Sequence, residues 1–327
     1  MERRSSPSAA AFFARFRRAP KAELHIHLEG SLAPASVERL ARAVPGSPLG
    51  GTGGLRARRR PGSPEAFLSL YRDVCRLLRS PADYALAARD LVRRLSREGI
   101  SRAEVYVSPA VVEKLGLPWV PVRDAIEAVF AEHERRGRGR VTVLLDSVRQ
   151  WGPGAAERVL ALHRASPWPR ARGFGLGGDE LSVPAREFRA VYREVRRLGL
   201  FPLVHAGEWG GPDSVAEALR WLSPVRIAHG FRAAEDPALV RLLARRRIPL
   251  DVCPTSNART GAFPTRLPHP ALVLLRSGVA VTVSTDDPGL FGTTLAAEFR
   301  RLERDGATGA ELRGLLAAGR AAALPPA

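Results

Sequence analysis

The chain has 327 residues, and its 51 lysines and arginines against 33 aspartates and glutamates give a formal net charge of +18. Hydrophobic residues make up 45% of it, which excludes a disordered or collagen-like chain. No window holds the ~18 uncharged apolar residues that would cross a bilayer. At roughly 100–200 residues per domain, the length permits one large domain or two ordinary ones.

Cys75 and Cys253 are the only cysteines, too few for a disulfide framework, so we expect a reducing, cytoplasmic compartment. The N-terminal extension, residues 1–19, contains the apolar, arginine-rich run Ala9–Arg18 behind three serines, a composition also typical of a transit peptide. Because this run continues into Pro20 and a strand without a linker, we expect a first helix packed on the domain.

Short β-rich runs alternate with helical patterns along the chain, which is typical of βαβ units around a parallel sheet. Eight such runs predict a (β/α)8 TIM barrel of the α/β class, formed by residues 1–327 as a single domain. The predicted strands are Ala22–Leu28, Ala103–Ser108, Val141–Asp146, Gly173–Gly177, Pro202–Ala206, Val225–His229, Pro249–Cys253 and Ala280–Thr285.

The interval between the first two strands is long and includes a Gly/Pro/Arg-rich loop over residues 45–64. An insertion after a barrel strand lies on the catalytic face, so we expect it to cover the active site, although residues 50–62 alone are also typical of a plain surface loop. Ser63 as N-cap and Pro64 as first helical residue predict a helix that includes Ala66–Ser80.

Two further helices are predicted over Ala85–Arg97 and Arg123–Glu134 from the same periodicity. Residues 321–327 are predicted to form a frayed tail.

Four of the seven histidines fall at or near the C-terminal ends of predicted strands: His25, His27, His205 and His229. Residues two apart on a strand point to the same face, so His25 and His27 project together toward the barrel axis. Converging imidazoles suit a borderline metal such as Zn²⁺. A single such histidine is typical of a hydrogen-bonded core; four at equivalent strand ends indicate a site.

Carboxylates join these histidines at the same end of the barrel. Glu208 follows the fifth strand, and Asp286 and Asp287 follow the eighth. The other three histidines lie on helical stretches or on a proline-flanked loop, and we expect all of them to face solvent: His133, His163 and His269.

Five motifs together resemble the adenosine deaminase family of metal-dependent aminohydrolases. They lie in the family's order and span Pro20 to about Gly292, so the resemblance covers most of the chain. The motifs are Pro20–Leu32 (PKAELHIHLEGSL), His205–Glu208 (HAGE), Arg226–Gly230 (RIAHG), Cys253–Asn257 (CPTSN) and Ser284–Pro288 (STDDP).

The resemblance implies a role for each matching position. His25, His27, His205 and Asp286 match the family's zinc ligands. Glu208 matches the proton-transferring carboxylate, and His229 matches the histidine that orients the metal-bound water. The positions matching substrate contacts are Asp287 at purine N7, Gly178 at purine N3, and His27 with Glu29 toward the rest of the substrate.

Elementary chemistry makes these implied roles coherent. Zinc lowers the pKa of a bound water toward ~7, so that hydroxide is available to attack C6 of an adenine ring. The attack needs a proton at N1, which Glu208 supplies if burial raises its pKa. His229 steers the water and stabilises the developing charge. Loss of ammonia then leaves a hypoxanthine-type product.

The scarcity of lysine predicts one zinc ion. Two-metal relatives on this barrel commonly bridge their ions with a modified lysine after the fourth strand. Neither Lys21 nor Lys114 lies there, and the other 49 basic residues (51 − 2) are arginines.

The chain departs from adenosine-specific members at two positions. Glu29 stands where they carry the aspartate that meets the ribose 5′-hydroxyl, and Gly175 stands where they tend to have aspartate. The Gly175–Gly178 run and Cys253–Asn257 resemble aminodeoxyfutalosine deaminases. The His27–Gly30 run resembles adenine deaminases, although bacterial ones tend to carry a serine variant of the Gly-Gly-Asp-Glu run. The small-molecule substrate, purine nucleoside or nucleobase, is left open.

Two other functions compete with deamination. A nucleic-acid-binding protein on a barrel scaffold would use the runs Arg56–Arg60, Arg135–Arg140 and Arg245–Arg247. Aromatic residues, 6% of the chain, are not interleaved with these runs as stacking platforms, so solvated helix ends and loops are favoured. The other is a different metal-dependent hydrolysis, of an amide or phosphoester. Arg58–Arg60 could also hold a carboxylate or phosphate of the substrate.

Overall fold

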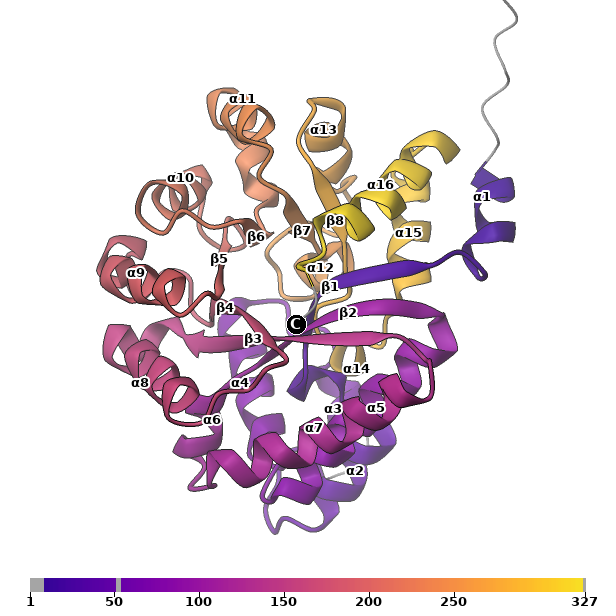
Figure 1. The fold of residues 1–327 in the computed structure, drawn as a ribbon. Helices are drawn as coiled ribbons and strands as arrows, with labels where there is room; N and C mark the ends of the chain where they lie inside the picture. Colours follow the sequence, from indigo (N-terminus) through magenta and orange to yellow (C-terminus); the bar gives the residue numbers. More distant parts are fainter. Residues whose placement is uncertain (1–8, 51–53, 326–327) are drawn as a thin grey trace, which may run out of the picture.

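Eight parallel strands form the centre of the molecule, in the order β1 to β8, in the computed structural model, which describes residues 9–50 and 54–325. The end of β8 returns to β1, where the His27 N–H donates to the Asp286 carbonyl at 3.0 Å. Figure 1 shows the strands ringed by helices, which confirms the TIM barrel. The strands are β1 (Lys21–His27), β2 (Ile100–Val107), β3 (Arg140–Val148), β4 (Ala171–Gly177), β5 (Phe201–Ala206), β6 (Arg226–His229), β7 (Leu250–Val252) and β8 (Val281–Val283).

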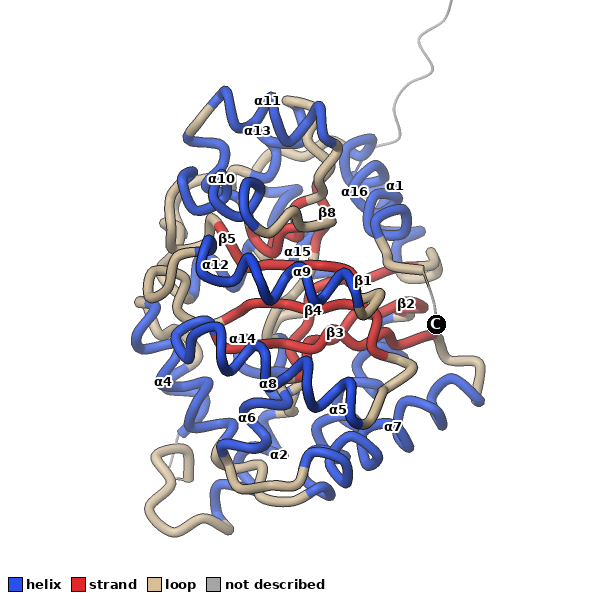
Figure 2. Tube along the Cα trace, turned by 60° about the vertical axis from the view of Figure 1, so that its left-hand side comes forward, coloured by secondary structure: helices blue, strands red, loops and turns tan. Residues whose placement is uncertain are grey.

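Helices lie above and below the strands in the view of Figure 2. The α-helices are α1 (Ala9–Phe16), α2 (Pro34–Arg42), α3 (Gly54–Arg58), α4 (Pro64–Cys75), α5 (Pro81–Glu98), α6 (Pro109–Lys114), α7 (Trp119–Arg135), α8 (Gly152–Ala165), α9 (Arg189–Arg197), α10 (Pro212–Trp221), α11 (Pro237–Arg246), α12 (Pro254–Arg259), α13 (Ala271–Arg276), α14 (Pro288–Phe291), α15 (Leu295–Arg304) and α16 (Gly309–Ala322). Short 3-10 turns are η1 (Glu29–Ser31), η2 (Arg149–Trp151), η3 (Ala185–Phe188) and η4 (Phe231–Glu235).

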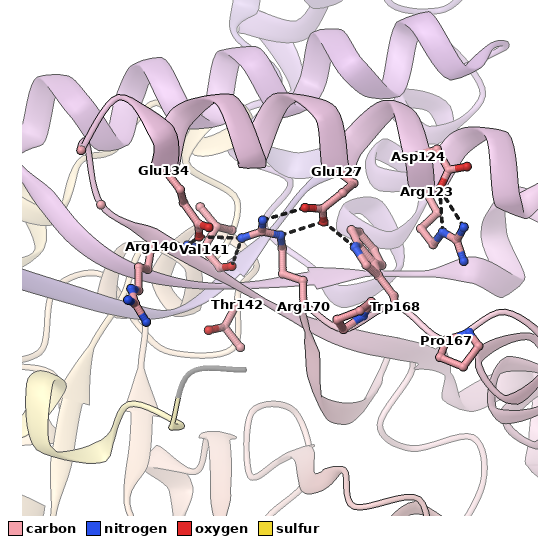
Figure 3. A pocket seen from close by; sticks show the side chains of 13 residues that line it. Arg123, Asp124, Glu127, Glu134, Arg140, Val141, Thr142, Pro167, Trp168 and Arg170 are labelled. Atoms are coloured by element: carbon pink, nitrogen blue, oxygen red, sulfur yellow. Dashed lines mark hydrogen bonds and ion pairs between the residues drawn. The ribbon is translucent and has the colours of Figure 1, made fainter.

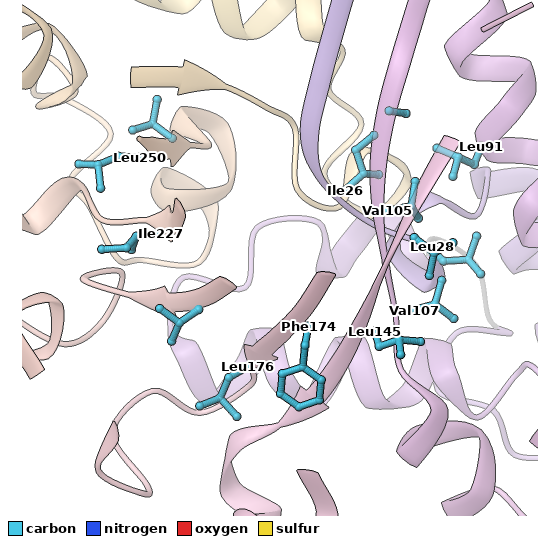
Figure 4. Close-up of a cluster of buried hydrophobic side chains, with 14 of the residues drawn as sticks. Ile26, Leu28, Leu91, Val105, Val107, Leu145, Phe174, Leu176, Ile227 and Leu250 are labelled. Carbon is cyan, nitrogen blue, oxygen red and sulfur yellow. The ribbon is translucent and has the colours of Figure 1, made fainter. Parts of the chain in front are cut away.

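The hydrophobic core fills the layer between strands and helices. In Figure 4, Ile26 and Leu28 from the first strand and its end lie beside Val105 of β2 and Leu91 of α5. All four side chains are fully buried. Because side chains alternate along a strand, the same alternation that turns Ile26 outward turns its neighbour His25 into the barrel. Packing of the outer layer therefore fixes the direction of the site residues.

The insertion between β1 and β2 lies over the C-terminal end of the barrel. Its helix α4 begins where predicted, because the Ser63 hydroxyl accepts a hydrogen bond from the Ala66 N–H at 3.2 Å. Phe67 of α4 stacks on Phe291 of α14 at 5.6 Å and meets Trp209 at 6.2 Å. The predicted cover is confirmed. Within the predicted loop 45–64, residues 51–53 lie outside the described residues, and α3 lies within the part that is described.

The N-terminal helix packs on the barrel's outer layer, as predicted. Phe12 and Phe16 of α1 contact Phe299 of α15 at 5.7 and 5.0 Å. The Lys21 ammonium donates to carbonyls at the end of this segment, including that of Phe16 at 2.8 Å. Residues 1–8 of the predicted extension lie outside the described residues.

The prediction of a frayed C-terminal tail is wrong for residues 321–325. Leu324 is buried against Tyr106, Leu144 and Leu203 inside the barrel. Its N–H donates to Glu104 Oε1 at 2.6 Å, and its carbonyl accepts from Arg102 at 3.0 Å. The tail is held because the Leu324 side chain packs on apolar side chains of the barrel while its backbone groups form hydrogen bonds with Glu104 and Arg102. Residues 326–327 of that predicted tail lie outside the described part.

Helices in the described ranges 9–50 and 54–325 are all too short or too polar to cross a membrane.

Candidate metal centre and active site

Four side-chain atoms from three strand ends converge on one point inside the barrel. The Nε2 atoms of His25, His27 and His205 lie 3.1–3.3 Å from one another. Asp286 Oδ1 lies 3.2 Å from His25 Nε2 and 3.4 Å from His27 Nε2. The structure thus brings together all four residues that the sequence predicts as metal ligands.

The spacing of these atoms fits a small divalent cation. Four ligand atoms at tetrahedral positions, ~2.0–2.1 Å from a zinc ion, stand about 3.3 Å apart. The observed separations of 3.1–3.4 Å match that value. Asp286 Oδ1 is buried and accepts no hydrogen bond from the described residues, whereas Oδ2 accepts one from Ser256 at 2.6 Å. The carboxylate is therefore oriented with one oxygen free for a cation.

Burial keeps these histidines neutral, which is the form that binds metal. The pKa of His25 and of His205 lies well below the ordinary value, because burial disfavours the charged form and neighbouring histidines add repulsion. Burial also lowers the pKa of His27, whose side chain is the most exposed of the three at 11%. Each imidazole therefore offers a lone pair near neutral pH.

Glu208 lies beside this cluster and faces His229. Glu208 Oε2 is 3.4 Å from His229 Nε2, and both side chains are buried. Burial raises the pKa of Glu208 well above its usual range, and the Asp286 and Glu180 charges raise it further. This environment favours the protonated form of the carboxyl group, which can donate a proton.

His229 is held by a hydrogen-bonded chain that sequence reasoning missed. The Asn257 side-chain amide lies 3.0 Å from His229 Nδ1, and Asn257 Oδ1 lies 3.2 Å from His269 Nε2. His269 Nδ1 accepts from the Ala271 N–H at 3.2 Å. Asn257 belongs to a motif already quoted from the sequence, but His269 carried no signal beyond its neighbouring prolines.

The prediction that the remaining histidines face solvent is wrong. His269 is 1% exposed and His133 is 4% exposed, while His163 is half-buried. His269 is buried because the loop before α13 folds under η4, where Phe231 and Phe263 pack on its ring at 5.1 and 5.5 Å.

Glu180, also missed from the sequence, fixes the backbone that carries Glu208. Its carboxylate accepts hydrogen bonds from four consecutive N–H groups, of residues 207–210, at 2.5–3.1 Å. The Ser214 hydroxyl donates to the same carboxylate. Glu180 ends the Gly-Gly-Asp-Glu run after β4, so its position at a strand end was the available signal.

Asp287 and Gly178, the two predicted purine contacts, follow β8 and β4. Both Asp287 carboxyl oxygens are buried without a hydrogen-bond partner among the described residues. Burial, then the neighbouring Asp286 charge, raises the pKa of Asp287 well above its ordinary value. Gly178 adopts φ +92°, which favours glycine, and a Cβ there would meet Gln150 Oε1 at 2.3 Å.

Glu29 lies just after the first strand, and the buried carboxyl group of Asp146 is close enough for the Glu29 charge to act on it. Tyr71 of α4 donates to Glu29 Oε2 at 3.1 Å, and burial raises the pKa of Glu29 to about 7. Asp146, at the end of β3, pairs across the sheet with Gly175, and burial raises its pKa to about 8. Asp146, like Asp286, lies near the end of a barrel strand, but the sequence analysis did not single it out as a site residue.

Backbone strain is present at two of these residues. His229 and Asp286 have φ of +60° and +65°, a left-handed conformation that non-glycine residues seldom adopt. Such conformations cost about 1–3 kcal/mol and persist where the surroundings impose them, commonly at functional sites.

A groove of about 710 Å³ lies elsewhere, at the N-terminal ends of β3 and β4. Figure 3 shows Arg170 in it between Glu127 and Glu134, with ion-pair distances of 2.7 and 2.5 Å. Arg170 is thus paired with two carboxylates, and the groove shares no residue with the metal-ligand cluster.

The arginine runs occupy different surroundings. Arg135–Arg140 and Arg245–Arg247 lie at the C-terminal ends of α7 and α11, where cations are favourable, and most of their side chains are exposed. Arg58 is paired with Asp73 at 2.6 Å.

Comparison with known proteins decides the family. The model of the family described as adenosine deaminase matches residues 20–325. This chain belongs to the adenosine deaminase family. It is accordingly a metal-dependent hydrolytic deaminase that acts on a C–N bond, and its His/Asp cluster occupies the catalytic end of the adenosine deaminase barrel.

Relatives within the adenosine deaminase family carry more than one substrate name. The chain is 36% identical over 295 residues to an aminodeoxyfutalosine deaminase of Streptomyces avermitilis, covering 86% of this chain and 79% of that one. It is 35% identical over 281 residues to an adenine deaminase of Chelativorans sp., covering 85% of each. A solved adenine deaminase from Arthrobacter aurescens matches with a TM-score of 0.88 at 28% identity, over 94% of both chains.

A second solved structure with the same fold as this chain contains a bound metal ion. It is an amidohydrolase from Burkhoderia ambifaria with bound zinc, with a TM-score of 0.87 at 25% identity, covering 98% of this chain and 90% of that one.

Proposed function

We propose that this protein uses one zinc ion to hydrolyse the exocyclic amine at C6 of an adenine-bearing nucleoside, releasing ammonia and a hypoxanthine-type product. The observation that carries the proposal is the convergence of four potential metal-ligand atoms beside the buried Glu208, whose pKa burial raises. That combination offers a metal site and a proton donor side by side.

His25, His27, His205 and Asp286 would hold the ion. When bound, it supplies the Lewis acidity that activates water at neutral pH. Zinc is supported by the three imidazole donors and by separations close to those of a tetrahedral zinc site. A single ion is supported by the positions of both lysines, because neither follows β4, where a lysine could bridge two ions. Lys21 donates to backbone carbonyls beside α1, and Lys114 lies 4.3 Å over the Trp151 ring.

Glu208 would move the protons of the reaction. In its neutral form it donates to ring N1 as C6 becomes tetrahedral, which relieves the charge that addition places on the ring. The resulting carboxylate then accepts the proton of the hydroxyl group added at C6 and passes it to the departing amine, which leaves as ammonia while the C6 oxygen becomes a carbonyl. His229, with its Nε2 toward Glu208, orients the attacking water and stabilises the charge that develops on its oxygen.

Asp287 and Gly178 would orient the purine. Burial raises the pKa of Asp287 and so favours the protonated carboxyl group, which can donate a hydrogen bond to purine N7, an acceptor only. The Gly178 backbone, left uncovered by a side chain, would meet purine N3. His27 and Glu29 border the space for the rest of the substrate, on the side where Tyr71 contacts Glu29.

An adenosine-like nucleoside such as aminodeoxyfutalosine is the proposed substrate class. The relative named for that activity is 36% identical. Adenine is the second candidate, because relatives of similar identity are named adenine deaminases. We also propose a cytoplasmic location, since both Cys75 and Cys253 are free and buried.

An ammonia-release assay tests the proposal. Zinc-loaded protein is given adenosine, 2′-deoxyadenosine, adenine and aminodeoxyfutalosine, with metal content measured in parallel. We expect a nucleoside to be deaminated and about one zinc per chain. Glu208→Gln should keep its zinc and lose activity by about 10²–10⁴-fold, the usual contribution of proton transfer. The exposed Glu187→Gln serves as a matched control.

Ammonia release from none of the four compounds would overturn the proposal. So would full activity in Glu208→Gln.

A further inference from the structure

We propose that His269, through Asn257, is a positioning residue that fixes the tautomer of His229. This inference rests on the proposed function, since it concerns how His229 presents its ring to the reacting water. It is carried by the hydrogen-bonded chain Ala271–His269–Asn257–His229, which connects the loop before α13 to the site.

The direction of each hydrogen bond in this chain follows from its first donor. The Ala271 N–H can only donate, so His269 Nδ1 accepts, and the proton of the neutral ring lies on Nε2. That Nε2–H donates to Asn257 Oδ1, which leaves the Asn257 amide group to donate to His229 Nδ1. His229 then carries its proton on Nε2, the nitrogen that faces Glu208.

The hydrogen bonds themselves require both histidines to be neutral, because a ring nitrogen that accepts a hydrogen bond carries no proton. His229 and His269 are each 1% exposed. The groups facing His229 are Glu208, Asn257 and the rings of His25 and His205. Among the described residues, Asn257 alone contacts Nδ1, so the tautomer depends on this one amide.

Substitutions that reverse or remove a hydrogen bond between these residues test the proposal. Asn257→Asp offers His229 an acceptor where the amide was a donor, which moves the His229 proton to Nδ1. His269→Leu removes the donor to Asn257 Oδ1, whereas His269→Gln retains an N–H donor and should rescue. His163→Gln, in a half-buried histidine of α8, is the matched control.

Two measurements on the metal-loaded protein separate positioning from general damage. Nitrogen-15 NMR of the histidine rings should show His229 as the Nε2–H tautomer in the parent and in His269→Gln. Asn257→Asp and His269→Leu should lose that signature. In these two variants kcat should fall about 10–100-fold at nearly unchanged KM, the effect typical of removing an outer partner of a site histidine.

A parent protein with its His229 proton on Nδ1, or an Asn257→Asp variant with unchanged signature and kcat, would overturn the inference. The NMR readout needs no turnover, so it stands even if no adenine compound is deaminated, and the two failures are distinguishable.

A second inference rests on a different observation, an arginine cluster at the rim of the barrel. The segment after α3 docks on α12, where the Gly62 N–H donates to the Arg259 carbonyl at 2.9 Å. Docking brings the positive charges of Arg59 and Arg60 close enough to Arg259 to lower its pKa, after burial as the larger cause. Arg59 also lies over α14, with Nη1 3.2 Å from where a Cβ of Gly292 would be.

None of these three guanidinium groups has a carboxylate within 4.0 Å among the described residues, although the more distant Glu298 acts on Arg259, whereas Arg58 beside them is paired with Asp73. Arg59 Nε is in addition buried without a hydrogen-bond partner. Gathering like charges is unfavourable unless an anion joins them. The cluster lies on elements that also carry site residues: Arg59 lies against Gly292 at the end of α14, which directly follows Asp287, and Arg259 ends α12, which contains Asn257.

From this geometry we infer that Arg59, Arg60 and Arg259 bind an oxyanion, a phosphate monoester or a carboxylate, at the end of the substrate distant from the purine. Guanidinium groups suit both because their N–H donors match paired oxygens. This inference rests on the proposed function and names part of its substrate class.

Product-type ligands test it without turnover. Calorimetric titration compares inosine, inosine 5′-phosphate and the inosine derivative whose 5′-carbon is a carboxylate. We expect at least one charged ligand to bind about tenfold or more tightly than inosine, as charge-assisted hydrogen bonds give. The preferred ligand tells phosphate from carboxylate. Arg59→Gln and Arg259→Gln should remove the advantage, and Arg56→Gln, exposed in the same segment, should retain it.

Equal or absent binding of the charged ligands would overturn the oxyanion site, as would an advantage that survives both substitutions. Charged-ligand binding without ammonia release from any adenine compound would overturn the proposed function alone.

Discussion

Glu180 holds the backbone of Glu208: its Oε2 accepts the Glu208 N–H at 3.1 Å while the same carboxylate accepts the N–H groups on either side. The site's proposed proton donor therefore sits on a loop whose shape is set by a carboxylate from the neighbouring strand end. This contact connects the segment after β4 to the segment after β5, close to the end of the strand that contains His205, a proposed metal ligand.

Glu180→Gln should loosen this loop. The amide group places N–H donors against backbone N–H donors, and hydrogen bonds to a charged acceptor are worth about 1.5–3 kcal/mol. We expect a lower melting temperature and a kcat reduced by about tenfold or more, measured by calorimetry and ammonia release. Glu187→Gln, on the nearby surface, should change neither. Unaltered kcat in Glu180→Gln would show that the loop keeps its shape without the carboxylate.

Asp146 should make the metal-free protein less stable as the pH rises. Its folded-state pKa of about 8 lies above the ordinary 3.8, so between these values the unfolded chain has released a proton that the native state retains. The free energy of unfolding therefore falls from pH 4 to pH 8 through this group. Relative to the parent, Asp146→Asn should gain stability over that window, as urea unfolding at several pH values would measure.

Asp213→Asn, on the exposed start of α10, is the control for that series and should show no such trend. A difference between parent and Asp146→Asn that is independent of pH would contradict the prediction.

Gly175 should tolerate no side chain while Asp146 faces it. A Cβ at Gly175 would lie 2.5 Å from Tyr106 Cε1 and 2.9 Å from Asp146 Oδ1. Gly175→Ala should cost about 1–3 kcal/mol of unfolding free energy by overpacking. Gly314→Ala, in open space on α16, should instead stabilise by about 0.5–1 kcal/mol.

Gly175, the position at which the resemblance predicts aspartate in adenosine-specific members, faces Asp146 of β3 in this chain. Gly175→Asp combined with Asp146→Gly should therefore regain part of the stability that Gly175→Asp loses alone. Strictly additive losses in a double-mutant cycle would show that the two positions do not share this space.

Leu324 should anchor the C-terminal segment to the barrel interior. It is 6% exposed, so Leu324→Ala should cost about 2–5 kcal/mol of unfolding free energy. A chain ending at residue 323 should lose more, because it also leaves Glu104 Oε1 without the Leu324 N–H. Leu181→Ala, 69% exposed, is the matched control. Equal melting temperatures for the truncated and full chains would refute the anchoring role.

The strand pattern and the strand-end motifs could be predicted from the sequence because they depend on local geometry. Alternation turns His25 and His27 to the same side of one strand, and parallel strands bring His205 and Asp286 to the same end of the barrel. These two rules bring the histidines and carboxylates to one end of the barrel, and the family resemblance selects four of them as predicted metal ligands.

Only the tertiary structure decided the partners of these residues. Asn257 connects His229 to His269, and Glu180 reaches the backbone of Glu208, by contacts between loops whose paths no local periodicity encodes. The same holds for residues expected to be exposed: His269 and Leu324 are buried because distant segments supply hydrogen bonds and apolar surface to them. The order of residues along the strands was enough to predict that these groups meet at one end of the barrel, because strand alternation is local; the packing of the barrel determined the burial, hydrogen-bond partners and backbone position of each one.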